Sequence, residues 1–443
     1  MFSIMIGKIL VFIGKILHKG SALPGEKVLR MNKKFFKKIK LPKTVIAVTG
    51  SSGKGSISSQ LANIYRKLGY KVAHNSKGSN LSGGIATLML ENCTLSGKIK
   101  KDVLIFEVDE RYAKYIFEDI VPNYVVISNI CRDQPPRQGN FDLVFEEIKK
   151  ALKPSMHLIL NADDPYLQKF ALDDYQITYY GMQETGYSYK DNMFESLNLF
   201  YCPNCGNKLK YNYYHFENLG DYYCEKCGFK RPNPKHTITN LDFENSTIVI
   251  DNKYEINLSF NILYVVYNTL AVFATASTLE LDLDKVCSII SDTTTNTKLN
   301  NLYEYKGRKV NVLSTKNENN TTFNEALFYT RRFSNRKVLV IGWKEISRRY
   351  SYDDVSWLYD VDFEILNKYD IEKIICVGVN RYDIATRMKY AGFDEKIIVT
   401  YNDLKEASNM IKKETNGDIF AILNFDYVEP FNTIMNEGGK RDR

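Results

Sequence analysis

A strand, a glycine-rich turn and a helix follow one another without a break in residues 44–60, TVIAVTGSSGKGSISSQ. Val45–Val48 is a short apolar run rich in β-branched residues, which predicts a buried parallel strand. After the turn, apolar residues recur on one helix face, at Ile57, Leu61, Ile64, Tyr65 and Leu68. This order is the context that a phosphate-binding loop requires. It predicts an α/β fold with a ligand at the carboxyl end of the strand.

The turn itself carries the groups that bind phosphate. Its glycines let the backbone approach phosphate oxygens, the free N–H groups at the helix start point at the anion, and Lys54 adds a positive charge. The common Walker pattern places Ser or Thr directly after the lysine, whereas this chain has Gly55 there and Ser56 next. Ser56 is therefore the expected magnesium ligand. The alternative is a plain glycine turn. We predict nucleotide contacts along the turn, at Gly50, Ser51, Ser52, Gly53, Lys54, Gly55 and Ser56.

Acidic residues follow two other predicted strands. The strand over residues 102–108 has Glu107 near its end and is followed by two further acids, and the strand over 157–160 leads into NADDP, residues 161–165. Carboxylates at the carboxyl end of a parallel strand, beside a phosphate loop, are suited to bind Mg²⁺ or to position a water on it. Strands that alternate with helical stretches predict a parallel sheet with helices on both faces.

Two CxxC pairs interrupt this pattern, and each places two thiolates on a tight turn closed by glycine. Four sulfurs at this spacing suit a tetrahedral Zn²⁺ ion, with disulfides or a redox pair as the alternatives. No open coordination position is evident, which indicates a structural zinc. The metal would stabilise an insertion at about residues 198–234. The predicted ligands are Cys202, Cys205, Cys224 and Cys227.

The first seventeen residues form an apolar segment that contains Lys8 and Lys15 and precedes no small-residue cleavage site. The segment is too short and too interrupted to span a membrane. We expect an amphipathic helix packed on the body of the protein, and the alternative is a helix lying on a membrane surface. A second, basic helix is expected over residues 27–40.

Composition narrows the class of protein. Hydrophobic residues make up 44% and charged residues 25% of the chain, as in a soluble globular protein. The net charge of +8 comes without a long basic run, so it does not indicate a nucleic-acid partner. The four cysteines outside the CxxC pairs lie in apolar surroundings, which indicates buried thiols and a reducing cytoplasm.

The pattern of the carboxyl-terminal part predicts a second, smaller α/β unit. It follows an apolar helix over residues 263–279 that contains Asn268, and it includes buried strands over 337–341, 373–377 and 419–423. Between these strands lies an acidic stretch, DDVSWLYDVDFE, which contains one of only two tryptophans. A solvated acidic helix start is the simpler interpretation of that stretch. No Ser/His/Asp set is visible in the chain.

Several motifs occur in the order found in the Mur ligase superfamily: VTGSSGKGS, KGSNLSGGIA, FEVDE, SNICRDQ, NADDP and VYNTLA. The cysteine insertion, KRPNP, FNEAL, DDVSWLYDVDFE and RMKYAG make the chain resemble the MurT-type branch of that superfamily. The resemblance covers nearly the whole chain. The zinc ribbon together with the DVSW segment is specific to that branch.

The resemblance implies a domain order and an activity. An N-terminal helical extension (1–40) precedes a central ATP-binding domain (41–298) that holds the zinc ribbon, and a C-terminal α/β domain (299–443) follows. The resemblance implies a ligase without the amino-terminal UDP-binding domain of other Mur ligases. The implied reaction is ATP-dependent amidation of the D-glutamate α-carboxyl of lipid II, through an acyl phosphate, to D-isoglutamine. A separate GatD-type glutaminase subunit supplies the ammonia.

The resemblance also implies roles for individual residues. Lys54 would hold the β- and γ-phosphates of ATP, and Ser56 and Glu107 would bind Mg²⁺. Asp354, just before Val-Ser-Trp, would orient the histidine of the partner glutaminase and complete its triad. The remaining implied nucleotide contacts are Asn161, Asp163 (or Asp164) on the ribose side and Asn268 at the adenine.

The chain departs from the family pattern at three places. GSSGKGS replaces the common GTNGKTT and is similar to the folylpolyglutamate synthetase branch, RDQPPRQGN replaces RDQLDRYGE, and WKEISRRYSYD replaces a loop rich in Asn, Asp and Gly. Two other functions therefore stay open. One is a ligase that acts on another carboxylate without a glutaminase, and the other is a nucleotide-binding scaffold with degenerate catalysis.

Overall fold

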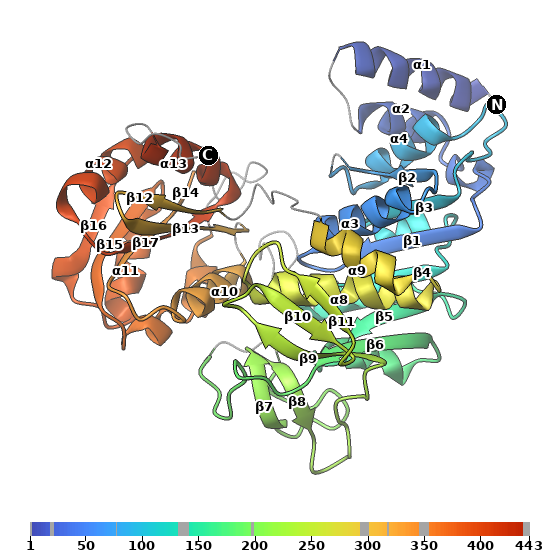
Figure 1. The fold of residues 1–443 in the computed structure, drawn as a ribbon. Coiled ribbons are helices and arrows are strands. Elements are labelled where there is room, and N and C mark those ends of the chain that lie inside the picture. The colour runs from blue at the N-terminus through green and yellow to red at the C-terminus, as the bar shows by residue number, and fades with distance from the viewer. Residues whose placement is uncertain are drawn as a thin grey trace. The chain divides into compact units, whose positions relative to one another are not determined.

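The computed structural model describes residues 2–17, 22–76, 78–131, 141–195, 199–292, 301–316, 319–344 and 354–436. The chain divides into two compact units (Figure 1). The first unit comprises Met1–Cys131, Phe141–Asp191 and Leu199–Thr294, and the second comprises Arg132–Asn140, Asn192–Asn198 and Thr295–Arg443. The domain boundary predicted between residues 298 and 299 lies outside the described residues. The domain limits therefore stay predictions.

Nine strands of the described residues form the sheet of the first unit, in the order β11-β10-β9-β6-β5-β4-β1-β3-β2. Their bounds are β1 (Thr44–Thr49), β2 (Val72–His74), β3 (Val103–Glu107), β4 (Tyr124–Ile127), β5 (His157–Asn161), β6 (Gln176–Met182), β9 (His236–Asp242), β10 (Thr247–Ile250) and β11 (Tyr254–Asn257). In this spatial order, every neighbouring pair between β2 and β9 is parallel. Strands β10 and β11 add an antiparallel edge next to β9. The parallel α/β fold predicted from the sequence is confirmed.

The strand order places a switch point at β1. β1 pairs with β3 on one side and with β4 on the other. The next two strands along the chain, β2 and β3, fill one side of β1, and β4, β5 and β6 then extend the sheet on the other side. In open α/β sheets, ligands bind at the carboxyl ends of the strands on either side of such a point. The glycine-rich turn after β1 lies at this position.

Helices cover both faces of this sheet. Val45, Ala47, Leu104 and Phe106 alternate along β1 and β3 and pack with α4, α5 and α7 in one apolar core. Helices α3 and α8 contact the sheet strands and each other, and α9 packs on both (Figure 1). The bounds are α3 (Lys54–Lys67), α4 (Ser82–Asn92), α5 (Ala113–Phe117), α7 (Phe141–Ala151), η2 (Leu167–Leu172), α8 (Leu263–Thr278) and α9 (Leu283–Asp292).

The amino-terminal segment forms α1 (Phe2–Ile16), α2 (Leu23–Met31) and the short η1 (Phe36–Lys38), and it packs on α4. The expected helix α1 is confirmed, whereas the expected helix over residues 27–40 is wrong in its extent. The chain leaves α2 at Asn32, whose backbone is extended (φ −148°), and Phe35 and Phe36 are then buried in the core. No helix of the described residues is long and apolar enough to cross a bilayer.

The cysteine-rich segment is inserted between β6 and β9, which pair directly in the sheet. It contains an antiparallel hairpin of β7 (Lys210–Phe216) and β8 (Leu219–Tyr223). The cysteine pairs lie on either side of this hairpin in the sequence. The small apolar cluster around it includes Leu209, Tyr222 and Phe229, besides two of the cysteines. The insertion thus has little core of its own.

The described part of the second unit has a sheet in the order β12-β13-β17-β14-β15-β16, parallel except for the β12–β13 pair. Helices α12 and α13 pack on one apolar face of this sheet. The bounds are β12 (Asn301–Tyr305), β13 (Arg308–Thr315), α10 (Asn320–Thr330), β14 (Lys337–Trp343), η3 (Ser356–Asp360), η4 (Phe363–Leu366), β15 (Ile371–Gly378), α11 (Arg381–Tyr390), η5 (Glu395–Ile397), β16 (Ile398–Tyr401), α12 (Leu404–Glu414), β17 (Asp418–Asn424) and α13 (Phe425–Asn436).

A short piece of chain from the sequence of the first unit packs on the second. The side chain of Phe194 is 2% exposed, and its ring centroid lies 6.0 Å from that of Phe328 on α10. The backbone N–H of Glu195 donates to a carboxylate oxygen of Asp362 over 3.1 Å. The chain therefore visits the second unit before it enters the cysteine-rich insertion, which the sequence pattern does not reveal.

Candidate nucleotide-binding site and metal centre

The turn between β1 and α3 needs glycine at two positions. Gly50 has φ +121°, and a Cβ atom there would lie 2.5 Å from the hydroxyl oxygen of Ser128. Gly53 has φ +82° and precedes the first residue of α3. A Cβ atom on Gly53 would lie 2.5 Å from Oδ1 of Asn268. Both left-handed backbone conformations and the close approaches favour glycine. The structure thus brings Asn268 of α8 to the phosphate loop, and its predicted contact with adenine stays a prediction.

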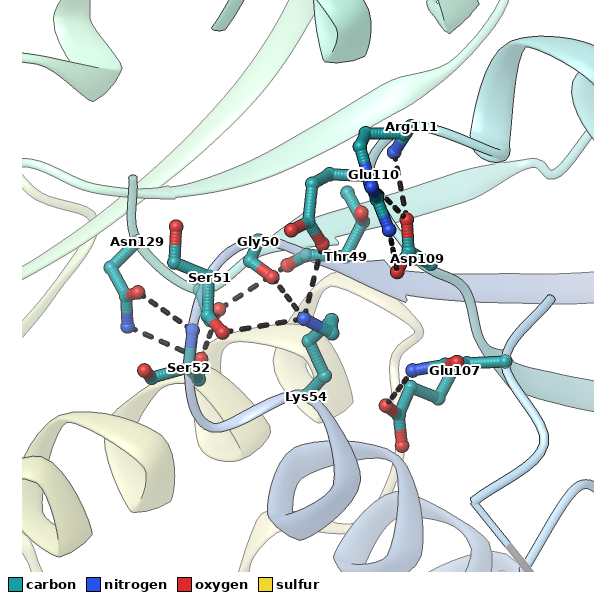
Figure 2. Close-up of polar contacts among 12 residues, drawn as sticks. Thr49, Gly50, Ser51, Ser52, Lys54, Glu107, Asp109, Glu110, Arg111 and Asn129 are labelled. Atoms are coloured by element: carbon teal, nitrogen blue, oxygen red, sulfur yellow. Dashed lines mark hydrogen bonds and ion pairs between the residues drawn. The ribbon is translucent and has the colours of Figure 1, made fainter. Parts of the chain in front are cut away.

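The end of β4 holds the turn in shape, as Figure 2 shows. The backbone N–H of Ser51 donates to the carbonyl of Asn129 over 2.9 Å, and the N–H of Ser52 donates to Oδ1 of Asn129 over 3.0 Å. The hydroxyl of Ser51 accepts from the N–H of Cys131 over 3.0 Å. These bonds fix the loop between two neighbouring parallel strands. A fixed loop can present the N terminus of α3 to an anion without further ordering.

Lys54 is the first residue of α3, and its side chain is buried, with 8% exposed. Its ammonium group donates to the carbonyl oxygens of Gly50 and Ser51 and lies 3.1 Å from Oε2 of Glu110 (Figure 2). Glu110 is 1% exposed, and its Oε1 is buried without a hydrogen-bond partner among the described residues. Glu110 is a site residue that the sequence analysis did not select. The available signal was its place in the acidic run after β3.

Glu107 ends β3, and its carboxylate lies beside the first turn of α3. The side-chain amide of Asn80 donates to Oε1 over 2.8 Å. Oε2 is 3.2 Å from the place that a Cβ atom on Gly55 would take, so the glycine leaves space in front of the carboxylate. A carboxylate facing such a space beside a phosphate loop fits a Mg²⁺ ion chemically. Ser56, the second predicted magnesium ligand, is exposed on the same turn.

The carboxylates after β5 are internal. Asp163 is fully buried: Oδ1 lies 2.6 Å from Nε of Arg231, and Oδ2 accepts from the hydroxyl of Tyr267 and the N–H of Met182, both over 2.8 Å. Asp164 accepts from the N–H of Tyr166, and burial raises the pKa of Asp164 to about 7. The amide oxygen of Asn161, which is also buried, accepts from the N–H of Asp163 over 3.0 Å. A ribose contact of either aspartate would require this network to open, and it stays a prediction.

Asp354 belongs to the second unit and is partly exposed just before η3. Its Oδ1 accepts from the N–H of Ser356 over 2.9 Å. The buried ring of Trp357 follows, with its centroid 5.2 Å from that of Trp343 and 5.0 Å from that of Phe323. The tryptophan therefore anchors the segment that carries Asp354. The neighbouring Asp353 lies outside the described residues.

Arg387 of α11 clamps the same segment from the other end. Its guanidinium donates to the carbonyl oxygens of Leu358 and Val361 and pairs with both carboxylate oxygens of Glu364, over 2.8 and 2.9 Å. The bidentate pair fixes the geometry of η3 and η4. Asp354 thus stands at the edge of an element that is held by aromatic packing and a bidentate ion pair.

The four cysteines of the insertion converge. The sulfur atoms of Cys202, Cys205, Cys224 and Cys227 all lie within 4.8 Å of one another. Each knuckle closes in the same way, because the N–H of Gly206 donates to the carbonyl of Cys202 and that of Gly228 to the carbonyl of Cys224. A hydrogen bond from the N–H of Phe229 lowers the pKa of Cys227, whereas burial raises the pKa of Cys202. Four thiolates in this arrangement are compatible with a zinc ion.

Comparison with known proteins decides the family. A family model of the Mur ligase middle domain matches residues 48–276, more than half of the chain. The chain belongs to the Mur ligase family. A second model, of the MurT ligase C-terminal region, matches residues 317–427. The resemblance inferred from the motifs is thus confirmed, and the Mur ligase fold implies ATP and Mg²⁺.

Curated relatives of this Mur ligase match along its length. The chain is 27% identical over 431 residues to the "Lipid II isoglutaminyl synthase (glutamine-hydrolyzing) subunit MurT" of Staphylococcus aureus strain COL, covering 95% of each chain. It is 26% identical over 436 residues to the protein of the same name in Streptococcus pneumoniae, covering 96% of this chain and 94% of the relative. The named relatives are ligases and subunits of a synthase.

Solved structures show the same fold. A pseudomurein peptide ligase type C from Methanothermus fervidus has a TM-score of 0.67 at 22% identity, covering 91% of this chain and 80% of that one. A MurF ligase from Thermotoga maritima in complex with ADP has a TM-score of 0.60 at 17% identity, covering 94% and 85%. At these identities the similarity establishes the Mur ligase fold alone.

The Lys54–Glu110 pair permits a test that separates nucleotide binding from folding. Lys54→Met should lower the free energy of unfolding by about 3 kcal/mol, because it leaves the Glu110 carboxylate buried without its cation. It should also weaken ATP binding at least about tenfold, because a charge-assisted bond to phosphate is lost. Adding Glu110→Gln should restore most of the stability and none of the binding. Urea denaturation and calorimetric titration with ATP and Mg²⁺ measure both.

The matched control is Lys67→Met, which removes an exposed lysine at the other end of α3. It should change neither stability nor binding appreciably. Wild-type ATP affinity in the double variant would show that Lys54 does not hold the nucleotide.

The cysteine cluster predicts a metal content of one zinc ion per chain. Cys224→Ser should abolish bound zinc and make the β7–β8 hairpin sensitive to protease, because the metal supplies the stability that the small core lacks. Cys287→Ser, which changes a buried thiol on α9 outside the cluster, should leave the zinc content unchanged. Mass spectrometry of metals in the purified proteins measures this. A zinc content of Cys224→Ser equal to that of wild type would contradict the assignment.

Proposed function

We propose that this chain is the ATP-dependent ligase subunit of a glutamine-hydrolysing enzyme that amidates the D-glutamate α-carboxyl of lipid II in the cytoplasm. The observation that carries the proposal is the match of the chain to MurT subunits along almost the full length of both proteins. The two family models fall in the order of the two units, and the second includes Asp354. The nitrogen donor would be a GatD-type glutaminase partner.

The phosphate loop would bind the triphosphate of ATP. The N terminus of α3 and Lys54 would neutralise charge on the β- and γ-phosphates. When the nucleotide binds, Lys54 would exchange its ion pair with Glu110 for one with the phosphates. Glu107 and Ser56 are the proposed ligands of a Mg²⁺ ion, which when bound would neutralise phosphate oxygens during transfer. Asn268 of α8, which lies against Gly53 of the loop, remains the proposed contact for the adenine of ATP.

The proposed reaction has two steps. An oxygen of the substrate α-carboxylate attacks the γ-phosphorus of ATP, the bond to the bridging oxygen of ADP breaks, and an acyl phosphate forms. Ammonia then attacks the acyl carbon, phosphate leaves with the bonding electrons, and the nitrogen loses a proton to give the primary amide. The lysine and the helix N terminus would serve the first step, because charge develops there on the transferred phosphoryl group.

Asp354 would act on the partner and not on the ligase reaction. A carboxylate that accepts from one nitrogen of an imidazole fixes its tautomer and orientation, so the other nitrogen can act as a base. The anchoring of η3 by Trp357 and Arg387 supports this role, because a triad carboxylate must be held rigidly. Asp354 is therefore a positioning residue in this proposal.

The proposal is tested by incubating the purified chain with its candidate glutaminase, ATP, lipid II and either glutamine or an ammonium salt. Conversion of the stem carboxyl to an amide lowers the mass by about one unit, and mass spectrometry of the stem peptide detects it. We expect amidation from both nitrogen sources in wild type and from neither in Lys54→Met. Asp354→Asn should retain amidation from ammonium and lose most of that from glutamine, because only the glutaminase step needs it.

Asp370→Asn is the control for Asp354→Asn, since Asp370 is an exposed aspartate of the same unit whose carboxylate lies 3.8 Å from Arg336. It should amidate from both nitrogen sources as wild type does. Two outcomes would overturn the proposal. ATP binding without amidation from either source indicates a scaffold, and amide formation on another carboxylate without the glutaminase indicates a different Mur-type ligase.

A further inference from the structure

Helix α1 exposes an apolar face to solvent. The side chains of this face are between 44% and 68% exposed. They are Phe2, Met5, Ile9, Phe12, Ile13 and Ile16. At 100° per residue they share one side of the helix, and no polar residue interrupts them. A helix on the surface of a globular domain normally presents polar side chains to solvent, so an exposed apolar face on α1 is unusual.

Close packing fixes which side of α1 faces the protein. The buried residues of α1 include Ile4, Gly7 and Val11. A Cβ atom on Gly7 would lie 2.6 Å from the side chain of Leu90 on α4 and 2.7 Å from that of Val28 on α2, so a larger residue would force these neighbours to shift. Figure 1 shows α1 as the outermost layer, beyond α2 and α4. The exposed apolar face is therefore a fixed part of the fold, because rotating α1 inward would break this contact.

The same region carries the positive charge of the chain. Residues 1–43 contain eleven Lys and Arg residues and a single acid, Glu26. The whole chain has a net charge of +8, so the remaining residues together are slightly acidic. The two lysines of α1 bind α4, because Lys8 donates to the carbonyl of Leu90 and Lys15 pairs with Glu91. On the adjacent α2, Lys27 and Arg30 are exposed. Apolar side chains and a surrounding excess of cations are the two features that bind a helix to an anionic lipid surface.

We propose that α1 docks the protein on an anionic phospholipid bilayer, with its exposed apolar face in the headgroup region and the exposed basic residues of α2 and of residues 32–43 near the lipid phosphates. A helix of 15 residues is about 22 Å long, too short to cross a bilayer, so it lies parallel to the surface. A second copy or another protein could cover the apolar face, but neither accounts for the local excess of cations. This inference goes beyond the proposed function, because it concerns the surface on which the chain works and not the reaction.

The test is flotation of the full chain with vesicles of phosphatidylglycerol and phosphatidylcholine, compared with vesicles of phosphatidylcholine alone. Wild type should bind the anionic vesicles, and added salt should weaken the binding. Ile9→Gln/Ile16→Gln should bind at least about tenfold more weakly, because two inserted side chains are lost. Leu143→Gln/Leu172→Gln is the matched control, since these leucines of the same unit are 57% and 60% exposed, and it should bind as wild type does.

Three outcomes would overturn the docking proposal. They are equal binding of both double variants, equal binding to neutral and anionic vesicles, and a wild type that stays off vesicles while Ile9→Gln/Ile16→Gln changes the mass of an oligomer. Light scattering measures that mass, and circular dichroism confirms that the exposed substitutions leave the fold intact. Amidation of a water-soluble substrate analogue separates this result from the reaction. The α1 variant should amidate the analogue as wild type does, whereas failure of the wild type would count against the proposed reaction only.

Discussion

The candidate site depends on one set of contacts, those that the buried ammonium group of Lys54 makes with nearby oxygen atoms. Buried in the turn after β1, it needs oxygen partners, and it takes them from its own loop and from Glu110 beyond β3. Asn129, from the end of β4, closes the loop from the other side. Lys54 and Asn129 therefore connect the carboxyl ends of three adjacent strands. The switch in strand order at β1 makes this possible, since β3 and β4 leave their chain ends on either side of the same loop.

The features that could be predicted from the sequence are those that depend on residues close together in the chain. The apolar β-branched runs located β1, β3 and β5 to within about two residues, because a strand buried on both faces has a local signature. The spacing of the glycines and Lys54 predicted the turn before α3. The CxxC knuckles predicted a cluster of four sulfurs that the structure confirms, since each knuckle is fixed by hydrogen bonds within a few residues.

What the sequence could not supply depends on long-range packing. Nothing local distinguishes Glu110 from its acidic neighbours as the partner of Lys54, and the pair of Asp163 with Arg231 spans 68 residues. The return of residues 192–195 to the second unit is likewise a tertiary contact. The apolar pattern of α1 predicted a helix but not its orientation, because the face that packs is decided by the contact of Gly7 with Leu90 and Val28.

The central claim is that the phosphate loop activates a substrate carboxylate by phosphorylating it, and transfer of an oxygen isotope tests this most directly. Lipid II labelled with ¹⁸O in the D-glutamate α-carboxyl would be amidated by the chain and its glutaminase, and the released phosphate analysed by mass spectrometry. An acyl phosphate intermediate requires one carboxyl oxygen to leave with phosphate. We therefore expect that each amide formed is accompanied by one released phosphate that contains one ¹⁸O atom. Amide formation with unlabelled phosphate would contradict it.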